Sequence, residues 1–332
     1  MPSSPLRPSG GRGLGEVGGR RETQPVPSTT SPFPSLTRRA PSLSPASGGE
    51  GVVTALCTLL SLFFFLATPA VAQTKYDTPW GKVATPSRGT AQAIGGYANG
   101  CIAGAVALDA EGPGFQVLRR WRNRYWGHPQ LIDYLDRLGA AFVARKLKPM
   151  LIGDMGQPRG GPMAYGHASH QIGIDVDILF TPGPMAASAR EALSDPPSML
   201  TANKQDVDPK RFGATQIAML KTAAADPLVA RIFVNYRIKK YLCLTLPPAE
   251  HGWIGRLRPW LGHDEHFHVR LKCPPGSPLC KDQEPIPVGD GCDDSLEEWF
   301  RPPPPRDPNA PPPPPPKPKI LPPACAAVLT AP

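Results

Sequence analysis

Two histidine-rich stretches decide the fold and chemistry of this chain: Gly166-His-Ala-Ser-His-Gln-Ile-Gly-Ile-Asp-Val-Asp177 and His263-Asp-Glu-His-Phe-His-Val-Arg-Leu271. They hold five of the seven histidines in a chain of 332 residues, which random scatter would rarely produce. Such clusters are typical of a metal site, because the neutral imidazole offers a lone pair to the ion.

Each stretch contains a predicted strand, at residues 174–180 and 267–271. Side chains alternate between the two faces of a strand, so His266 and His268 share one face. Asp175 and Asp177 share a face for the same reason. Two such strands can present histidine and aspartate side by side over one patch of sheet.

Zinc is the metal that this ligand chemistry favours, because two or three imidazoles and one carboxylate leave an open position for water. The alternative for any one histidine is a surface or hydrogen-bonded core residue, and for a lone H-x-x-H it is the commoner one. Five histidines with two aspartates favour the metal site. The motif differs from the helical H-E-x-x-H of common metalloproteases, because glutamate is absent and Gly166 and Gly173 flank it.

The remaining hydrophobic periodicity predicts a mixture of helices and strands. Helices are expected over 129–146 and 217–225, and further strands over 101–108, 150–153 and 232–235. Strands and helices mix without regular alternation. We therefore expect an α+β fold with a central, mainly antiparallel sheet that carries the zinc site and with helices on one side.

Proline is concentrated at the two ends of the chain. Residues 1–50 hold nine of the 46 prolines and residues 301–332 hold fifteen. Neither end can bury enough apolar surface to offset its conformational entropy. We expect a disordered segment over 1–50, one zinc-binding domain over 73–300, and a proline-rich tail over 301–332 that is extended over 301–323 and that Cys325 ties back.

The uncharged segment 51–72 predicts the hydrophobic region of a signal peptide, cleaved after Ala70-Val-Ala72. A transmembrane helix is the alternative, but Pro69 and the small residues at the end favour cleavage. Arg38-Arg39 offers a twin-arginine signal as a further alternative. No second hydrophobic run of that length follows, so no stable membrane span is expected after cleavage.

The charge balance suits an anionic partner. The formal net charge is +9, and the first 72 residues carry six Arg and three Glu, which leaves +6 after cleavage. Such a charge fits a cell-wall polymer, a membrane surface or nucleic acid. The exported setting argues against nucleic acid.

Six of the seven cysteines lie outside the signal region, and an even number in an exported chain predicts disulfides. Cys273 and Cys280 enclose a turn-rich segment that can close a small loop. Cys325 lies beyond the proline tract and is most useful if it ties the tail to the domain. A structural zinc is the alternative, but the sequence has no C-x-x-C pair.

Together these motifs resemble those of the penicillin-insensitive murein endopeptidases. These are periplasmic zinc peptidases that share a fold with D-alanyl-D-alanine metallopeptidases, lysostaphin-type enzymes and hedgehog N-terminal domains. The similarity covers residues 90–325. It includes Asn99-Gly-Cys101, Leu151-Ile-Gly-Asp-Met-Gly156, Arg231-Ile-Phe-Val-Asn235, Gly289-Asp-Gly-Cys292 and the proline tail.

The resemblance implies roles for individual residues. His170, Asp177 and His268 match the zinc ligands. His266 matches a residue beside the metal water, a base or transition-state stabiliser, while His263 matches a further active-site histidine. His167 matches another one and is a candidate metal ligand.

The resemblance also bears on a second metal and on the disulfides. Where some members have Asp and His for a second zinc, this chain has Asn203 and Asp206, so we do not expect a second metal. The implied disulfides are Cys101–Cys325, Cys243–Cys292 and Cys273–Cys280.

The implied function is hydrolysis of D-alanyl-diaminopimelate cross-links in peptidoglycan by a periplasmic, zinc-dependent endopeptidase. One alternative is a D,D-carboxypeptidase on the same fold, which needs a basic residue to bind the free terminal carboxylate. The other is a non-catalytic wall-binding protein with a structural zinc, in which a fourth protein ligand such as His167 closes the site.

Overall fold

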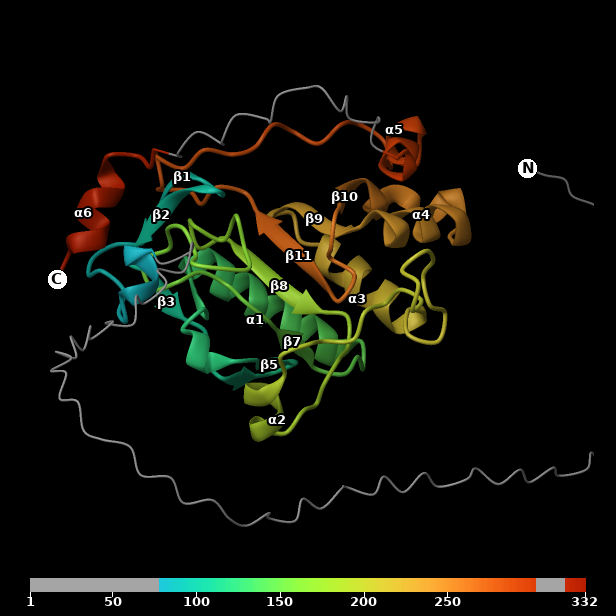
Figure 1. Ribbon diagram of the computed structural model, residues 1–332, viewed down its shortest axis with the longest axis horizontal. Coiled ribbons are helices and arrows are strands. Elements are labelled where there is room, and N and C mark those ends of the chain that lie inside the picture. The colour runs from blue at the N-terminus through green and yellow to red at the C-terminus, as the bar shows by residue number, and fades with distance from the viewer. Residues whose placement is uncertain (1–77, 303–319) are drawn as a thin grey trace, which may run out of the picture. The chain divides into compact units, whose positions relative to one another are not determined.

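The computed structural model describes residues 78–302 and 320–332 (Figure 1). The expected disordered segment 1–50, the signal region 51–72 and most of the proline-rich tail lie outside the described residues. The strands are β1 (Gln92–Gly96), β2 (Asn99–Ala103), β3 (Val106–Ala107), β4 (Glu111–Gly112), β5 (Phe115–Val117), β6 (Trp126–Gly127), β7 (Met150–Ile152), β8 (Asp175–Leu179), β9 (Val229–Asn235), β10 (Leu257–Trp260) and β11 (His266–Leu271).

The helices lie between these strands and at the C-terminus. They are α1 (Pro129–Ala144), α2 (Ala187–Ala192), α3 (Ala214–Ala224), α4 (Tyr236–Thr245), α5 (Asp294–Glu297) and α6 (Ala324–Thr330), with the 3-10 helices η1 (Pro79–Lys82), η2 (Arg120–Arg122), η3 (Pro248–Arg256) and η4 (Glu298–Phe300). The helix predicted over 129–146 and the strands predicted at 150–153, 174–180 and 267–271 are confirmed within one or two residues.

Seven strands form the central sheet in the order β10-β9-β11-β8-β7-β5-β4. β11 pairs antiparallel with β8 and β9, and β7–β8 and β4–β5 are antiparallel as well. β10 runs parallel to β9 and β5 parallel to β7. Each parallel pair is joined by a helical crossover, through α4 and α1 respectively, because parallel neighbours cannot be joined by a tight turn. The α+β class is confirmed, and these parallel pairs make the sheet a mixed one, which the sequence did not predict.

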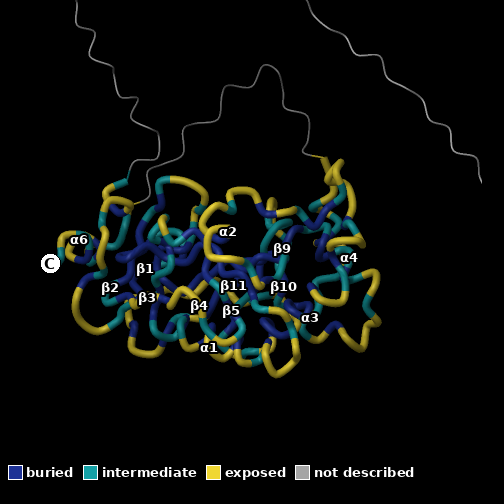
Figure 2. Tube along the Cα trace, turned by 90° about the horizontal axis from the view of Figure 1, so that it is seen from below, coloured by how far each residue is buried: buried dark blue, intermediate teal, exposed yellow. Residues whose placement is uncertain are grey.

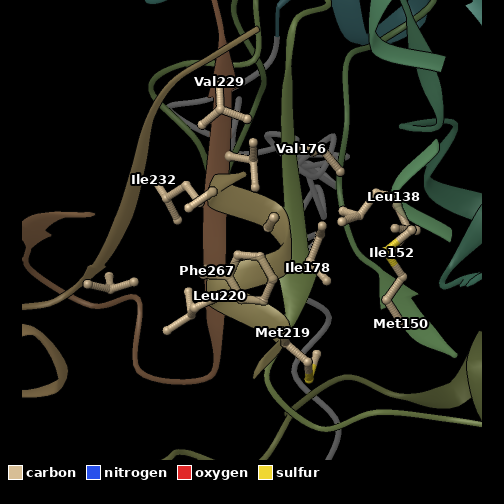
Figure 3. Close-up of a cluster of buried hydrophobic side chains, with 14 of the residues drawn as sticks. Leu138, Met150, Ile152, Val176, Ile178, Met219, Leu220, Val229, Ile232 and Phe267 are labelled. Carbon is tan, nitrogen blue, oxygen red and sulfur yellow. The ribbon is translucent and has the colours of Figure 1, made fainter. Parts of the chain in front are cut away.

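The main core lies between one face of the sheet and helices α1 and α3, which lie behind the central strands in Figure 1. Val176, Ile178 and Phe267 alternate toward this core, where they are fully buried (Figure 3). In Figure 2 the sheet occupies the buried centre of the fold. Alternate residues of a strand point to opposite faces of the sheet. The side chains of β8 and β11 that do not enter this core therefore lie on the other face.

Helix α1 begins where the sequence predicts. His128 is its N-cap and its side chain accepts a hydrogen bond from the Gln130 N–H, while Pro129 occupies the first turn. Its buried residues recur at helical spacing, namely Leu131, Tyr134, Leu135, Leu138 and Phe142. That apolar stripe seats the helix against the sheet.

Helix α2 departs from the expectation that helices cover one side of the sheet. Met185 and Leu193, which flank α2, pack on a separate cluster of Leu118, Leu151 and Leu179. Those leucines alternate with residues of the main core and therefore lie on the opposite face. This small apolar cluster therefore covers the second face of the sheet beside β5 and β7.

A two-stranded antiparallel hairpin, β1–β2, packs against α6 at one end of the domain. The strand predicted over 101–108 is split into β2 and β3, because Gly104 between them adopts the left-handed region with φ 58°. Residues 324–330, which follow the segment 301–323 that is expected to be extended, form α6. Cys325 in α6 bonds Cys101 in β2, so the implied Cys101–Cys325 pair is confirmed.

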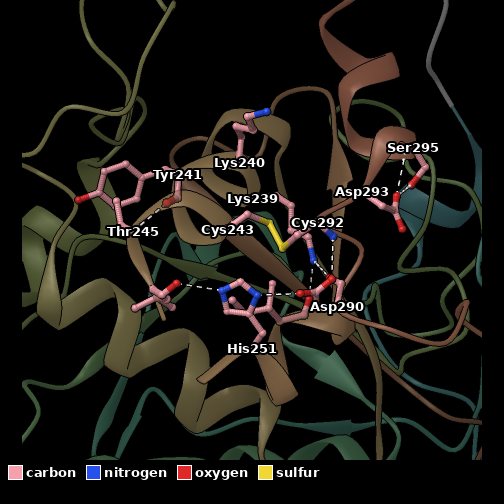
Figure 4. Close-up of a disulfide and its surroundings, with 12 residues drawn as sticks. Lys239, Lys240, Tyr241, Cys243, Thr245, His251, Asp290, Cys292, Asp293 and Ser295 are labelled. Carbon is pink, nitrogen blue, oxygen red and sulfur yellow. Dashed lines mark hydrogen bonds and ion pairs between the residues drawn. A yellow bond between two sulfur atoms is a disulfide. The ribbon is translucent and has the colours of Figure 1, made fainter. Parts of the chain in front are cut away.

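The other two implied disulfides, Cys243–Cys292 and Cys273–Cys280, are also confirmed. Figure 4 shows the first of them beside the buried Lys239. The Lys239 ammonium donates to the Asp290 carbonyl, and burial lowers the pKa of Lys239 to about 7. The disulfide and these contacts fasten the segment before α5 to helix α4.

We predict that the long disulfide stabilises the fold more than the short one. Cys101–Cys325 closes a sequence separation of 224 residues and Cys273–Cys280 one of 7. A longer loop removes more entropy from the unfolded chain, so replacing the first pair by alanines should lower the free energy of unfolding by about 2 to 3 kcal/mol more than replacing the second. Urea unfolding without reductant measures both, and equal losses would contradict the prediction.

Candidate metal centre

The candidate centre lies on the face of β8 and β11 opposite the main core. The antiparallel register sets His268 directly across from Asp177. His268 Nδ1 and His170 Nε2 each lie 3.4 Å from the same atom, Asp177 Oδ1. The rings of His170 and His268 are 4.5 Å apart, edge to face. Three of the expected ligands therefore converge on one point.

His170 comes from the loop that leads into β8. Its φ of 64° lies in the left-handed region, which residues other than glycine seldom adopt. Its backbone N–H donates to Asp175 Oδ2 at 3.1 Å, which holds the loop in place. Gly173, with φ 68°, completes the turn. Backbone strain at a buried histidine is typical of functional sites.

Burial leaves these side chains with unmet hydrogen-bonding capacity. His170 is fully buried, and Asp177 and His268 are each 4% exposed. Both ring nitrogens of His170 and Oδ1 of Asp177 have no hydrogen-bond partner within the described residues. Each buried polar atom left unpaired costs about 1 to 3 kcal/mol. A zinc ion among them would satisfy these atoms together, so the residues present fit the metal.

The local charges set the protonation states of the candidate ligands. Burial lowers the pKa of His268 to about 3, against the opposing effect of Asp175. Burial alone would raise the pKa of Asp177, but its histidine neighbours, His170 first, hold it well below the usual range. Burial would lower the pKa of His170, but Asp177 and the other aspartates outweigh it and raise that pKa. The site thus combines an ionised carboxylate with the neutral imidazole of His268, whereas zinc must compete with a proton at His170.

His167 lies on the other side of the carboxylate. Its Nδ1 is 3.5 Å from Asp177 Oδ2 and its ring is 4.5 Å from that of His170. His167, His170 and Asp177 can each offer a ligand atom such that all these atoms lie within 4.8 Å of one another. His167 Nε2 contacts Asp154 Oδ2 at 3.1 Å. The structure thus brings His167 to the site as well.

Two buried aspartates support the ligands from behind. Asp175 Oδ1 lies 3.4 Å from His268 Nε2, and Arg270 binds both Asp175 oxygens at 2.9 and 3.0 Å. Burial would raise the pKa of Asp175, but Arg270 and His268 outweigh it and hold that pKa below its usual range. Asp154 supports His167 in the same way. Carboxylates of this kind fix the orientation of metal-binding imidazoles.

His266 and His263 border the cluster without joining it as closely. His266 Nε2 is 3.7 Å from Asp177 Oδ1, and its side chain is 23% exposed. Burial lowers the pKa of His266 to about 4, despite the opposing effect of Asp177. The His263 ring lies 4.9 Å from that of His266, and burial lowers the pKa of His263 too. Two neutral imidazoles therefore line the edge of the site.

Two other groups of polar residues are accounted for by local structure. Asn203 and Asp206 are exposed, and Asn203 Oδ1 accepts from the Thr201 hydroxyl within its own loop. His251 and Asp290 lie with Cys292 at metal-ligand distances. However, the two His251 nitrogens contact Asp290 and a backbone carbonyl, and Cys292 is disulfide-bonded.

Sequence reasoning missed Asp154 and the arginines around it as parts of the site. Arg119, Arg122 and Arg124 all approach this carboxylate. Asp154 lies in a segment that the sequence singled out, Leu151–Gly156, but only as part of a resemblance. The run of basic residues between β5 and β6 is the one signal that could have indicated them.

Comparison with known proteins places the chain among murein hydrolases. Residues 93–330 match the family described as penicillin-insensitive murein endopeptidase. Proteins of that name are 45% identical over 262 residues in Haemophilus influenzae, covering 76% of this chain and 88% of the relative, and 42% identical over 274 residues in Klebsiella pneumoniae, covering 82% and 97%. One from Yersinia pestis is 44% identical over 253 residues, covering 76% and 90%. Within residues 78–302 and 320–332, no helix has the length and apolar character needed to cross a membrane.

We predict that zinc added to metal-free protein raises its melting temperature, because the ion binds the folded state. Asp177→Asn should remove most of that increase, since Asp177 Oδ1 is the point where the ligands meet. His251→Gln is the matched control, because both nitrogens of His251 already have partners. Thermal denaturation with zinc and with a chelator measures the shift.

The comparison between variants decides the outcome. A zinc-dependent increase that is as large in Asp177→Asn as in the unaltered protein would place the metal elsewhere. Loss of the zinc-dependent increase in melting temperature in His251→Gln would instead place the metal at the group of His251, Asp290 and Cys292.

Proposed function

The chain belongs to the penicillin-insensitive murein endopeptidase family and is a peptidoglycan hydrolase, and on that premise we propose that it is a zinc-dependent endopeptidase cutting D-alanyl-diaminopimelate cross-links. The observation that carries the zinc proposal is the set of buried, unpaired atoms of His170 and Asp177 beside His268. The proposed ligands are these three residues, with His167 as the candidate fourth.

His170, Asp177 and His268 would hold the zinc, which would supply Lewis-acid chemistry that lowers the pKa of water and polarises the carbonyl of the scissile bond. His266 suits the role of general base, because its Nε2 lies 3.7 Å from Asp177 Oδ1 and part of its side chain is exposed to incoming substrate. Its Nε2 takes the proton of the attacking water and then gives it to the leaving amine. His263, beside His266, is positioned to stabilise the negative charge that develops on the carbonyl oxygen.

No serine nucleophile takes part in this scheme, which agrees with the word penicillin-insensitive in the family description. Export to the periplasm belongs to the same proposal, since the substrate is a wall polymer and residues 51–72 carry the predicted signal. That signal lies outside the described residues.

Two alternatives remain in view because they use the same ligands. A D,D-carboxypeptidase would release a terminal D-Ala, and a structural zinc would have His167 as a closing fourth ligand. The names of the relatives favour the endopeptidase over both. Mass spectrometry of muropeptides after incubation with the protein distinguishes cleaved cross-links from trimmed termini.

We predict that two classes of variant separate ligation from catalysis. His170→Ala, Asp177→Ala and His268→Ala should lose zinc and activity together, because a site that loses one of three ligands binds metal much more weakly. His266→Ala should keep its zinc while turnover falls by about a hundredfold or more. Zinc content by atomic emission and dimer-to-monomer muropeptide conversion give the two measurements.

The control is His251→Ala, because His251 contacts Asp290 and the Leu246 carbonyl beside the Cys243–Cys292 disulfide (Figure 4). Metal loss in His266→Ala would make that residue a ligand. Zinc-loaded, unaltered protein that leaves cross-linked muropeptides intact would exclude the endopeptidase function.

A further inference from the structure

Three arginines surround one carboxylate at the β7 side of the candidate metal centre. Arg124 and Arg122 donate from Nη1 to Asp154 Oδ2 at 2.8 and 3.4 Å, and Arg119 Nη2 lies 3.9 Å from Oδ1. Asp154 Oδ2 also contacts His167 Nε2 at 3.1 Å. The cluster therefore begins one imidazole ring away from the proposed ligands, and its positive charge exceeds its negative charge.

The guanidinium groups are not fully paired. The Nε atoms of Arg119 and Arg122 are buried and have no hydrogen-bond partner in the described part of the chain. Each guanidinium offers five N–H donors, and leaving buried donors unused is costly. One carboxylate cannot satisfy three such groups. The imbalance points to a second anion at this place.

Arg122 is the member with the most capacity to spare. Arg124 also donates to the Tyr165 carbonyl at 3.1 Å, and Arg119 to the Leu193 carbonyl at 3.3 Å. Arg122 has the long contact to Asp154, and its side chain is 18% exposed, against 5% for Arg124. It lies at the rim of the cluster, 5.3 Å from the Trp121 ring.

A constrained turn holds this arrangement. Arg119 and Asn123, which bracket η2, both lie in the left-handed region, with φ of 48° and 53°. Asn123 is fixed by its side chain, which accepts from Trp126 Nε1 at 2.7 Å and donates to the Ala84 carbonyl at 3.1 Å. Such conformations persist where the surroundings enforce them, often at functional sites.

We propose that Arg122, supported by Arg119, binds the free carboxylate of the substrate residue that supplies the scissile nitrogen. This inference rests on the proposed function. In the cross-link, diaminopimelate carries a carboxylate on the carbon bonded to that nitrogen, so a negative charge lies within one residue of the bond to be cut. A guanidinium can bind such a carboxylate through two parallel hydrogen bonds.

The β9–β10 flank of the centre combines aromatic and cationic side chains. On the β9–β10 flank, Phe233 contacts the His268 ring edge-on at 5.2 Å and Trp260 lies 5.5 Å beyond it. That flank also carries Arg258, directly across from Phe233, and the Arg270 guanidinium, 5.0 Å from the Phe233 ring. Cations therefore lie on both flanks, and the carboxylate is assigned to Arg122 because of the spare donors of that residue in the cluster that contacts His167.

This assignment also bears on the D,D-carboxypeptidase alternative. A terminal D-Ala carries its carboxylate at the equivalent position, so a basic residue here serves either reaction. The presence of Arg122 therefore does not distinguish the endopeptidase from the D,D-carboxypeptidase. The feature to test is the substrate carboxylate that Arg122 is proposed to bind.

The test compares two cross-linked peptide dimers that differ in one group, the diaminopimelate carboxylate being free or amidated. The zinc-loaded, unaltered protein should prefer the free form by about ten- to a hundredfold in kcat/KM. In Arg122→Ala that preference should fall to near one. Arg122→Lys should restore part of it, because lysine keeps the charge but not the paired geometry.

The matched control is Arg137→Ala, on α1, where Arg137 forms an exposed ion pair with Asp226. It should keep the preference of the unaltered protein. An equal loss on both dimers in Arg122→Ala would make Arg122 a structural residue, and an unchanged preference would exclude it from binding the carboxylate.

A binding experiment separates failure of this inference from failure of the proposed function. Calorimetry with the diaminopimelate-terminated product peptide, free or amidated, needs no hydrolysis. An unaltered protein that cleaves neither dimer but binds the free product more tightly, with Arg122→Ala losing that difference, would support the carboxylate site while rejecting the endopeptidase. Equal binding of both products would overturn the carboxylate site.

Discussion

The antiparallel pairing of β8 with β11 is the constraint on which the rest of the site depends. It sets His268 opposite Asp177, and the period of two along each strand turns Phe267 and Ile178 into the core behind them. A slip of one residue would exchange the two faces, so burying the core also fixes the positions of the proposed ligands. The packing energy of an ordinary apolar core thereby holds an ionised carboxylate and its histidines at one point.

Burying such a cluster of charged and polar groups costs free energy. Ion pairs between arginines and aspartates around the cluster offset part of that cost. Asp175 joins Arg270 to His268 and to the backbone of His170, while Asp154 joins three arginines to His167. Each aspartate is ionised because its cationic neighbours outweigh the effect of burial on its pKa. The proposed ligands are thus oriented by charge as well as by packing.

The sequence could predict the elements whose side chains follow a simple period. The apolar stripe of α1, the alternation in β8 and β11, and the histidine clusters all met that condition. It could not predict α4 or β10, whose burial depends on distant partners, or the parallel pairs, which depend on where a crossover helix returns. The sequence did not indicate the role of Asp154 for a similar reason. That role depends on arginines some 30 residues away in the sequence.

Asp154 is also the residue through which ligand orientation and the arginine cluster are coupled. Without its carboxylate, Arg119, Arg122 and Arg124 would face one another uncompensated, and His167 would lose its contact at Nε2. The Asp154 carboxylate holds the three arginines together beside the proposed ligands. The Nε donors of Arg119 and Arg122 have no hydrogen-bond partner among the described residues. Interactions with parts of a substrate away from the reacting bond can be used to position that bond. An excess of cations fixed by one shared aspartate is a physical means of doing so, because it draws the charged end of the substrate to the side where His167 already lies.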